Sequence, residues 1–244
     1  MPTKRVPSVR PPPVGRPKNR LLAGLPKAEF QRIRRHLTTV PLTVKITLLK
    51  RGAPIRYVYF PNGGVCSVTA MMKNGNAVEV ATVGDEGMIG MAAFFGGLAM
   101  PGESMVQVPD TDAERMPVDV FYREMDQRGA LYKAISRYSQ GTIALMMQSI
   151  ACIALHGVQE RCCRWLLMTH DRVRADQFTL SHEFLAMMLG STRPTVTVVA
   201  RRLQHARVIR YTHAKITILD RQRLEAMSCE CYATVKAEFD RLGL

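Results

Sequence analysis

Positively charged side chains gather in the last third of the chain, where their spacing suits contact with a polyanion. Residues 190–223 carry eight Lys and Arg residues against Asp220 alone, in a chain of 244 residues and net charge +14. Between residues 53 and 126 the balance reverses, with four basic and ten acidic residues. A basic stripe beside an acidic body is typical of a protein that touches a polyanion with one end. The alternative is a basic surface with no such partner.

The residues that would make this contact lie in a stretch with conflicting structural signals, LGSTRPTVTVVARRL (residues 189–203). Thr195 to Val199 is an unbroken β-branched run, which favours a strand. Thr192 and Pro194 instead mark a helix start, because threonine caps a first turn and proline loses no internal hydrogen bond there. In a helix, one apolar face would be formed by Val196, Val199, Ala200 and Leu203. A helix is predicted, because burial contributes roughly 1.5–3 kcal/mol per large apolar side chain and poor propensity costs roughly a few tenths of a kcal/mol per residue.

A second helix is expected immediately upstream, over residues 181–189. Ser181 is a good N-cap for it, and Gly190 supplies the positive φ that a sharp turn between two helices needs. Two helices joined by a short glycine-containing turn form the helix-turn-helix unit, whose second helix enters the major groove of DNA. Residues 208–219 (VIRYTHAKITIL) then alternate into a hairpin with its tip at Thr212 to Lys215, which predicts a winged version.

The sequence upstream of this unit predicts a roll of short strands. The folded part is expected to begin near Leu21, and a short amphipathic helix is expected within residues 21–37, with Pro26 in its first turn. Across residues 40–120, short β-rich runs alternate with turn sequences, and Asn74-Gly75 between two apolar runs is a strong hairpin signal. Regularly spaced strands of this kind favour a small antiparallel barrel or roll.

A long helix is expected over residues 129–156, followed by another over 158–172. In the first of these helices, apolar residues recur close to every seventh position, at Leu131, Ile135, Ile143, Met146, Ile150 and Ile153. Gln148, Ser149 and His156 interrupt the apolar run, which argues against a membrane span. Burial against a second copy explains the pattern better, so a homodimer is predicted. A core helix of a monomer is the alternative.

The residues quoted so far carry a family resemblance. Wing included, residues 180–225 (LSHEFLAMMLGSTRPTVTVVARRLQHARVIRYTHAKITILDRQRLE) resemble the DNA-binding domain of the Crp/Fnr transcription regulators. The short amphipathic helix, the glycine-punctuated roll and the long helix follow that family's order, so the resemblance covers about residues 21–226. It implies an α+β fold, with an N-terminal antiparallel β-roll (a cyclic-nucleotide-binding-like jelly roll), a long dimerisation helix and a C-terminal winged helix-turn-helix.

The resemblance also implies a domain division and partners. The expected parts are a disordered basic tail (1–20), a β-roll sensor domain (21–128), a dimerisation helix (129–157) and a winged helix-turn-helix domain (158–244). The expected partners are a second copy of the chain, double-stranded DNA with a near-palindromic site, and RNA polymerase, with no membrane. The expected location is the cytoplasm, because the N-terminus lacks the apolar region of a signal peptide.

In the family pattern the first turn of the recognition helix carries an arginine that reads guanine, followed by a glutamate. Here Arg193 keeps the arginine, but Pro194 replaces the glutamate and cannot accept a hydrogen bond from cytosine. The family's second basic residue is replaced by Val198, which suits contact with a thymine methyl group. Phosphate contacts are expected from Arg201, Arg202 and Lys215. The whole predicted DNA-binding set is Ser181, Thr192, Arg193, Thr195, Thr197, Val198, Arg201, Arg202 and Lys215.

The resemblance weakens at the effector site. Family members that bind cyclic nucleotides have a Gly-Glu pair for the ribose and an Arg-Ser pair for the phosphate. The nearest positions here are Gly90-Met91 and Gly102-Glu103-Ser104, and Met91 is no useful acceptor for a ribose hydroxyl. Glu103 would repel a phosphate, so no cyclic nucleotide is expected. The methionines that instead suit an apolar pocket are Met71, Met72, Met88, Met91, Met100 and Met105.

No other cofactor or catalytic site is supported by the sequence. The first cysteine is Cys66 and has no cysteine group near it, so an iron–sulfur cluster is not expected, and no histidine stands out as a haem ligand. Cys229 and Cys231 are too close together to form a tetrahedral site alone, so no metal site is predicted. No catalytic residues are expected, because nucleophile triads and phosphate-cradling loops are missing. The effector, if there is one, stays unknown.

Two other functions remain open at this point. One is a small-ligand-binding module whose C-terminal unit mediates protein contacts. The other is membrane attachment through the long helix. Retention of DNA fragments distinguishes the predicted regulator from the first alternative, and sedimentation with membranes identifies the second.

Overall fold

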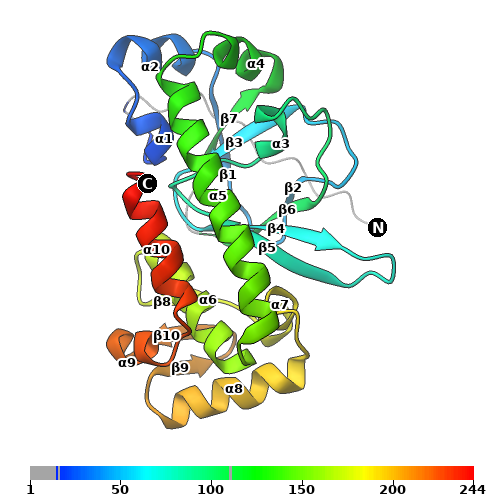
Figure 1. Cartoon of the computed structure of the whole chain (residues 1–244), viewed down its shortest axis with the longest axis vertical. Helices are drawn as coiled ribbons and strands as arrows, with labels where there is room; N and C mark the ends of the chain where they lie inside the picture. The colour runs from blue at the N-terminus through cyan, green and yellow to red at the C-terminus, as the bar shows by residue number, and fades with distance from the viewer. Residues whose placement is uncertain (1–14, 16, 110–111) are drawn as a thin grey trace.

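The computed structural model describes residues 15, 17–109 and 112–244, and it places a β-roll and a C-terminal helical unit at opposite ends of a long helix (Figure 1). Most of the expected basic tail, residues 1–14 and 16, lies outside the described residues. Its last part belongs to the fold. Asn19 is fully buried, caps the helix α1 (Arg20–Ala23), and donates hydrogen bonds from Nδ2 to the carbonyl oxygens of Pro61 and Gly87, both at 2.9 Å.

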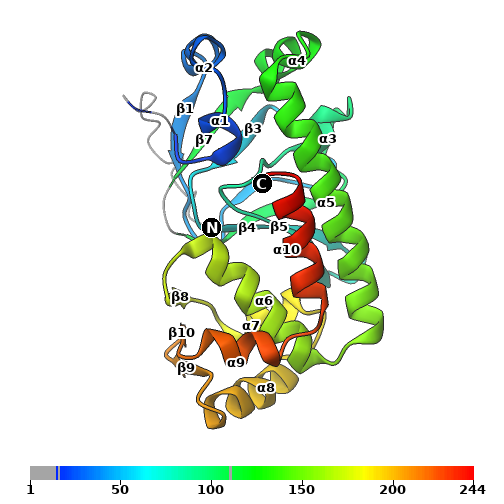
Figure 2. The same ribbon diagram turned by 60° about the vertical axis from the view of Figure 1, so that its left-hand side comes forward.

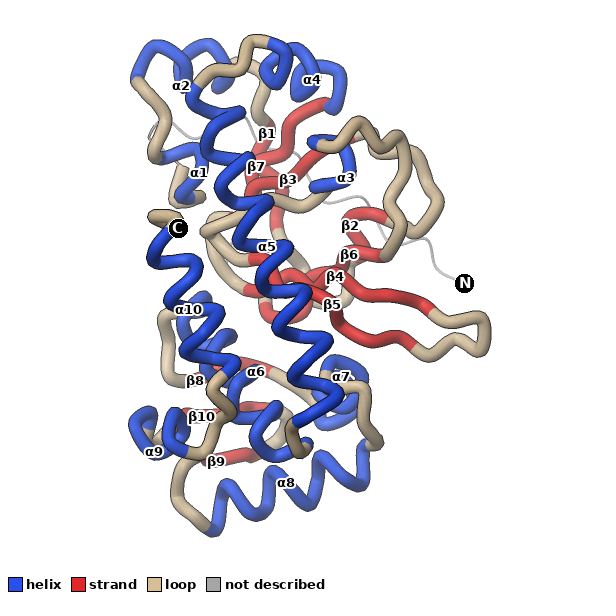
Figure 3. The backbone as a smooth tube through the Cα atoms, viewed as in Figure 1, coloured by secondary structure: helices blue, strands red, loops and turns tan. Residues whose placement is uncertain are grey.

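Two antiparallel sheets form the roll, which confirms the predicted α+β fold (Figure 3). The first has the strand order β1 (Thr38–Pro41), β7 (Asp112–Pro117), β3 (Tyr57–Pro61). The second has the order β2 (Thr47–Leu49), β6 (Glu103–Val108), β4 (Val65–Met71), β5 (Ala77–Val83). Strands β4 and β5 turn at the predicted Asn74-Gly75, where Gly75 has a φ of 85°.

Short helices flank the roll, and the first of them differs from the prediction. The expected amphipathic helix is α2 (Lys27–Arg34), with Pro26 as its N-cap instead of a first-turn residue, and the separate short helix α1 precedes it. The physical reason is that proline disfavours helical backbone in the residue before it, so Leu25 cannot continue α1 into α2. The other two helices of the roll are α3 (Met91–Phe94) and α4 (Val118–Asp126).

Helix α5 (Ala130–Leu155) has two apolar faces. Its inner face is buried and includes Leu131, Ile135, Tyr138 and Leu145. Its outer face exposes Ile143, Met147 and Ile150 to 50%, 67% and 71%. The predicted repeat combined residues from both faces, because a sequence pattern does not separate two stripes on one helix.

Helix α10 (Cys231–Arg241) lies along α5 (Figure 2) and was not predicted from the sequence. Gly141 of α5 allows this approach, because a Cβ there would lie 3.3 Å from Phe239 and from Leu242. By length and composition α5 could cross a membrane. Instead, its inner face packs on α10, α1, α4 and β5 within the protein.

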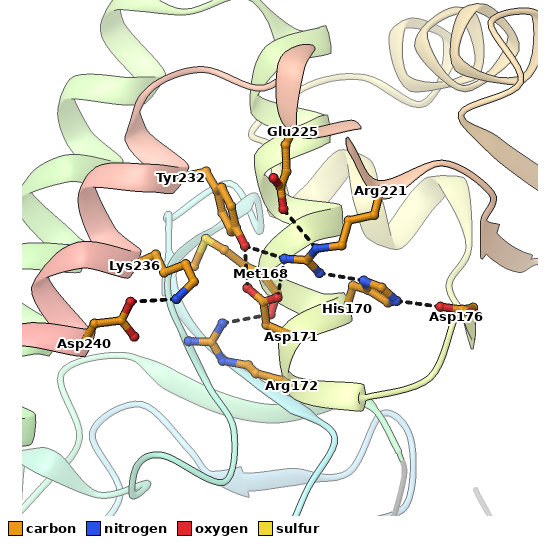
Figure 4. A network of polar contacts seen from close by, with 10 residues as sticks. All are labelled: Met168, His170, Asp171, Arg172, Asp176, Arg221, Glu225, Tyr232, Lys236 and Asp240. Atoms are coloured by element: carbon orange, nitrogen blue, oxygen red, sulfur yellow. Dashed lines mark hydrogen bonds and ion pairs between the residues drawn. The ribbon is translucent and has the colours of Figure 1, made fainter. Parts of the chain in front are cut away.

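A polar network attaches α10 and α9 (Arg221–Ala226) to α6 (Val158–Val173), as Figure 4 shows. Arg221 Nη2 lies 2.7 Å from Asp171 Oδ1, and its Nη1 lies 2.7 Å from His170 Nδ1. The Tyr232 hydroxyl donates to Asp171 Oδ2 at 3.0 Å. Charged and aromatic groups from three helices therefore fix the C-terminal segment in place.

The roll contacts the C-terminal unit directly as well as through α5. Trp165 of α6 donates from Nε1 to Glu79 Oε1 of β5 at 2.8 Å, and Arg172 pairs with Glu86 at 2.8 Å. Gly190 lies against Val78 of β5, with a Cβ position 3.6 Å from the valine methyl groups. The C-terminal unit is therefore docked on β5.

The contact at Glu79 predicts a pH-dependent stability. Burial raises the pKa of Glu79 to about 7, although hydrogen bonds from Ser67 and Trp165 oppose the increase. A pKa that is higher in the folded chain than in the unfolded chain contributes stability at low pH, and this contribution is lost as the pH rises through about 7. The free energy of unfolding should therefore fall between about pH 4.5 and pH 7 by an amount on the order of 1–3 kcal/mol from this group.

Denaturant unfolding of the Glu79→Gln variant at several pH values tests this. The amide keeps the size of the side chain and does not ionise, so the variant should lose less stability than the unmodified chain as the pH rises. Glu183→Gln, at an exposed carboxylate of the C-terminal unit, is the control and should follow the unmodified chain. Parallel profiles for the chain and Glu79→Gln would show that Glu79 does not cause the dependence.

Candidate DNA-binding surface

Helices α7 (His182–Met188) and α8 (Arg193–His205) form the predicted helix-turn-helix. The Ser181 hydroxyl accepts from the amide of Phe184 at 3.2 Å, and Gly190 has the expected positive φ of 55°. Thr192 caps α8 by accepting from the amide of Thr195 at 3.4 Å, and Pro194 lies in the first turn. The buried face is the predicted one, formed by Val196, Val199, Ala200 and Leu203. Burial therefore outweighs strand propensity here.

The outer face of α8 presents the predicted contact residues to solvent. Arg193, Thr195, Arg201 and Arg202 are exposed, and Val198 is 47% exposed between them. Within residues 15, 17–109 and 112–244, no ion pair engages any of these three arginines. Their charges are therefore available to an outside partner.

Four members of the predicted set form hydrogen bonds within the protein: Thr192 and Thr195 with each other, and Ser181 and Thr197 with other groups. Ser181 is half-buried and its hydroxyl caps α7. The Thr197 hydroxyl donates to the carbonyl oxygen of Arg193 at 2.9 Å and lies 3.0 Å from His182 Nδ1. The His182 ring stacks on Tyr211 with centroids 4.1 Å apart. Burial lowers the pKa of His182, and the charges of Arg193 and Arg201 lower it further. His182 and Tyr211 therefore support α8 from the protein side, through Thr197.

The wing has the expected hairpin and one further strand. Strands β9 (Ile209–Thr212) and β10 (Lys215–Ile218) meet at His213 and Ala214, which both have positive φ values. Lys215 is exposed at the tip, as predicted. Strand β8 (Gln177–Thr179) pairs with β10 and completes a three-stranded sheet, where the sequence predicted two strands and a loop. Its alternation of exposed Gln177, buried Phe178 and exposed Thr179 is too short to predict a strand by itself.

The five predicted effector residues do not form one site. Gly90 and Met91 line an apolar cavity between the roll and α5. The Glu103 carboxylate instead accepts from the Thr47 hydroxyl at 3.1 Å, on the β2–β6 pair. Ser104 is fully buried in β6, and a Cβ at Gly102 would lie 2.5 Å from the carbonyl oxygen of Thr69. Residues 102–104 therefore belong to the sheet structure and do not line this cavity.

The cavity has a volume of about 470 Å³ and an almost wholly apolar lining. Three of the six predicted methionines line it, Met88, Met91 and Met100, together with Phe95 and Met146. Met71, Met72 and Met105 are not part of the lining. Tyr138 and Thr142 of α5 are its polar side chains. Among the residues that the structure describes, none in the lining carries a positive charge for a phosphate group.

Solved structures of transcription regulators share this fold. A protein described as a crp/fnr-family transcriptional regulator from Eubacterium rectale has a TM-score of 0.67 and 19% identity, over 86% of this chain and 98% of its own. FixK2 from Bradyrhizobium japonicum also has a TM-score of 0.67, with 16% identity over 79% and 98% of the two chains. A CRP/FNR-family regulator from Thermus thermophilus has a TM-score of 0.62 and 22% identity, over 78% and 97%.

The sequence itself provides the decisive match. Residues 160–227 match the profile of the Crp-like helix-turn-helix domain. The chain therefore carries a Crp-like helix-turn-helix domain. No curated protein matches the sequence.

The family match is limited to the C-terminal part of the chain, and the solved structures share the fold over most of it. The matched residues run from α6 to the end of α9, so they include the helix-turn-helix and the wing but not α10.

Proposed function

We propose that this chain is a Crp/Fnr-type transcription regulator that binds a near-palindromic DNA operator as a homodimer, with α8 of each copy in the major groove. The observation that carries the proposal is the outer face of α8, where Arg193, Arg201 and Arg202 are exposed without ion-pair partners in the described part of the chain. A helix of this kind in the major groove brings side chains to base edges and phosphates.

Within this surface we assign base reading to the first turn of α8 and phosphate binding to its later part. Arg193 is exposed at the N-terminal end, where its planar guanidinium suits the O6 and N7 atoms of guanine. Val198, one and a half turns later, suits a thymine methyl group. Arg201, Arg202 and Lys215 suit phosphates, which fix position but carry no sequence information. Thr192 and Thr195 bond to each other at 2.9 Å and offer hydroxyl groups beside Arg193.

The homodimer is supported by the outer face of α5. Ile143, Met147, Ile150 and Ala154 follow one another at intervals of four, three and four residues, the spacing of a coiled-coil seam. All four are exposed, although α10 covers the opposite side of the helix. A soluble chain rarely leaves such a stripe in water, so a second α5 packed against it is the natural partner.

The roll is proposed as a sensor that does not bind cyclic nucleotides. Gly90 and Met91 line an apolar cavity in which no described residue has a cationic side chain, and Glu103 is engaged by Thr47. A charged cyclic phosphate would lose its hydration there without gaining a cation. A small apolar molecule suits the same cavity better.

The experiment that tests the function is selection of genomic DNA fragments by the full chain, with and without millimolar cyclic AMP or cyclic GMP. A regulator with this sensor should retain the same fragments, with near-palindromic sequences, in all conditions. A small-ligand module that uses its C-terminal unit for protein contacts would retain none. Enhancement by a cyclic nucleotide would contradict the assignment of the roll.

The phosphate assignment predicts a change in salt dependence for Arg201→Ala. The variant should bind operator and random duplex more weakly by similar factors, and the slope of log K against log salt should decrease by about 1 per half-site. Fluorescence anisotropy over a range of salt concentrations measures both. Lys50→Ala, at an exposed lysine of the roll, is the control and should leave the slope unchanged. An unchanged slope for Arg201→Ala would remove its phosphate role.

The remaining assignments follow from the same proposal. The chain divides into a tail (1–20) whose last residues, Asn19 and Arg20, belong to the roll, a sensor (21–128), a dimerisation helix (129–157) and a DNA-binding domain (158–244). A transcription regulator of this kind acts in the cytoplasm and contacts RNA polymerase at the promoter.

A further inference from the structure

Three cysteines and one histidine from distant parts of the sequence meet at the end of α5 near the C-terminal unit. Cys152 lies in the last turn of α5, and His156 follows that helix directly. Cys229 and Cys231 lie where α9 leads into α10. The four potential ligand atoms all lie within 4.8 Å of one another. Cys152 Sγ is 3.5 Å from Cys229 Sγ, and Cys231 Sγ is 3.5 Å from His156 Nδ1.

We propose that Cys152, His156, Cys229 and Cys231 bind one zinc ion in a tetrahedral Cys₃His site. Zinc binds thiolate sulfur at about 2.3 Å and imidazole nitrogen at about 2.0–2.1 Å. In a tetrahedron with these bond lengths, sulfur atoms lie about 3.8 Å apart, and sulfur and nitrogen about 3.5 Å apart. The observed separations already approach these values. Small side-chain movements therefore complete the site.

The surroundings of the four side chains also suit a metal. His156 Nε2 lies 3.1 Å from Glu230 Oε2, and a proton on Nε2 leaves Nδ1 free to face the three sulfur atoms. A carboxylate that orients a ligating histidine in this way is a common feature of zinc sites. Gln148 Nε2 lies 3.0 Å from Cys231 Sγ and can donate a hydrogen bond to a thiolate.

Burial and charge at the cluster support the same assignment. The three cysteines are 0–5% exposed and form a small buried cluster separate from the main core. On zinc binding, the three thiols release their protons to solvent, which leaves a net charge of −1 at the site. Arg164, whose Nη2 donates to Ser149 Oγ at 2.8 Å, lies beside Cys152 and offsets that charge.

The sequence predicted no metal site, because Cys229 and Cys231 alone cannot surround an ion. The fold supplies the other two ligands from Cys152 and His156, which are more than seventy positions earlier. The segment between the two pairs contains the whole helix-turn-helix and wing. A zinc ion would therefore attach the far end of the DNA-binding unit to the end of α5.

Cobalt binding to the full chain tests the site directly. The reduced, metal-free chain should take up one Co²⁺ per chain and show the strong visible bands of tetrahedral cobalt and an ultraviolet thiolate-to-cobalt band. Zn²⁺ should displace the cobalt and remove both signals. The paired change Cys229→Ser and Cys231→Ser should abolish them. Cys66→Ala, at a buried cysteine of the roll, is the control and should bind cobalt as the unmodified chain does.

Two variants at His156 test the site independently, in case the serine variant does not fold. His156→Cys keeps four ligands, so it should bind one cobalt ion with a stronger thiolate-to-cobalt band, whereas His156→Ala should bind cobalt at least tenfold more weakly. Circular dichroism of each variant reports folding independently. Failure of the folded unmodified chain to bind either metal would overturn the proposal, and so would undiminished binding by the folded serine variant.

Two of these cysteines could instead form a disulfide, and the mass of the non-reduced chain distinguishes a disulfide from a zinc site. Oxidation of Cys152 and Cys229 by an outside oxidant would join the two sulfur atoms and remove two protons and two electrons. The non-reduced mass of the chain purified without added reductant would then be two hydrogens lower. Predominance of that species, without zinc in elemental analysis, would overturn the zinc assignment in favour of a disulfide.

Discussion

Replacing both Met147 and Ile150 with glutamate should convert the chain to a monomer and lower its affinity for a palindromic operator at least a hundredfold. The two side chains are 67% and 71% exposed on the outer face of α5, where a second copy would bury them. Each contributes roughly 1.5–3 kcal/mol when buried, and a charge in the seam adds the cost of desolvating it. A monomer also engages only one half-site, so it loses the effective concentration that links two recognition helices.

Light scattering after size-exclusion chromatography measures the mass, and anisotropy with an operator duplex measures the affinity. The matched control is Met72→Glu with Leu98→Glu, which adds the same two charges at exposed apolar side chains of the roll, outside α5. It should remain a dimer with ordinary operator affinity. A dimeric Met147→Glu/Ile150→Glu variant would show that the subunits pair through some other surface.

Replacing Arg193 with alanine should reduce operator affinity tenfold to a hundredfold or more and reduce affinity for random duplex far less. A bidentate arginine–guanine pair contributes about 1–3 kcal/mol of discrimination, and a homodimer loses the pair in both half-sites. Among the described residues, the Arg193 side chain makes no hydrogen bond or ion pair, so its removal should leave α8 intact. The loss should therefore appear in DNA specificity and not in thermal stability.

Competition binding against operators with single base changes measures the specificity. Arg193→Ala should become indifferent to the guanine that the unmodified chain requires and keep its other preferences. Arg35→Ala is the control, because Arg35 is exposed beside α2, at the end of the molecule opposite α8 (Figure 1). Equal losses on operator and random duplex would mean that Arg193 binds phosphate and does not read a base.

Local signals in the sequence predicted the DNA-binding surface well. Ser181, Gly190 and Thr192 act on backbone groups a few residues away, so their roles as caps and turn are visible without the rest of the fold. The spacing of Val196 and Leu203 similarly determines which side of α8 is buried. The arginines on the opposite side then follow from helix geometry.

The sequence did not predict the features that depend on distant partners. Strand β8 exists because it pairs with β10, nearly forty residues later, and its own three residues carry no strand pattern. Helix α10 did have a readable pattern, since Tyr232, Val235 and Phe239 share one face, but the family resemblance ended before it. The residues at 102–104 were aligned on a family motif, whereas their burial depends on β4 and β2.

The docking of β5 on the C-terminal unit has a consequence for modular engineering. Glu79 accepts a hydrogen bond from the Trp165 indole, and Val78 packs against Gly190. The roll therefore supplies part of the packing surface of the helix-turn-helix. A chimera that joins residues 158–244 to a foreign roll would remove the hydrogen-bond acceptor of Trp165 and expose Leu189, which lies beside β5. A working chimera must therefore include the β4–β5 hairpin together with residues 158–244, so the transferable unit is discontinuous in sequence.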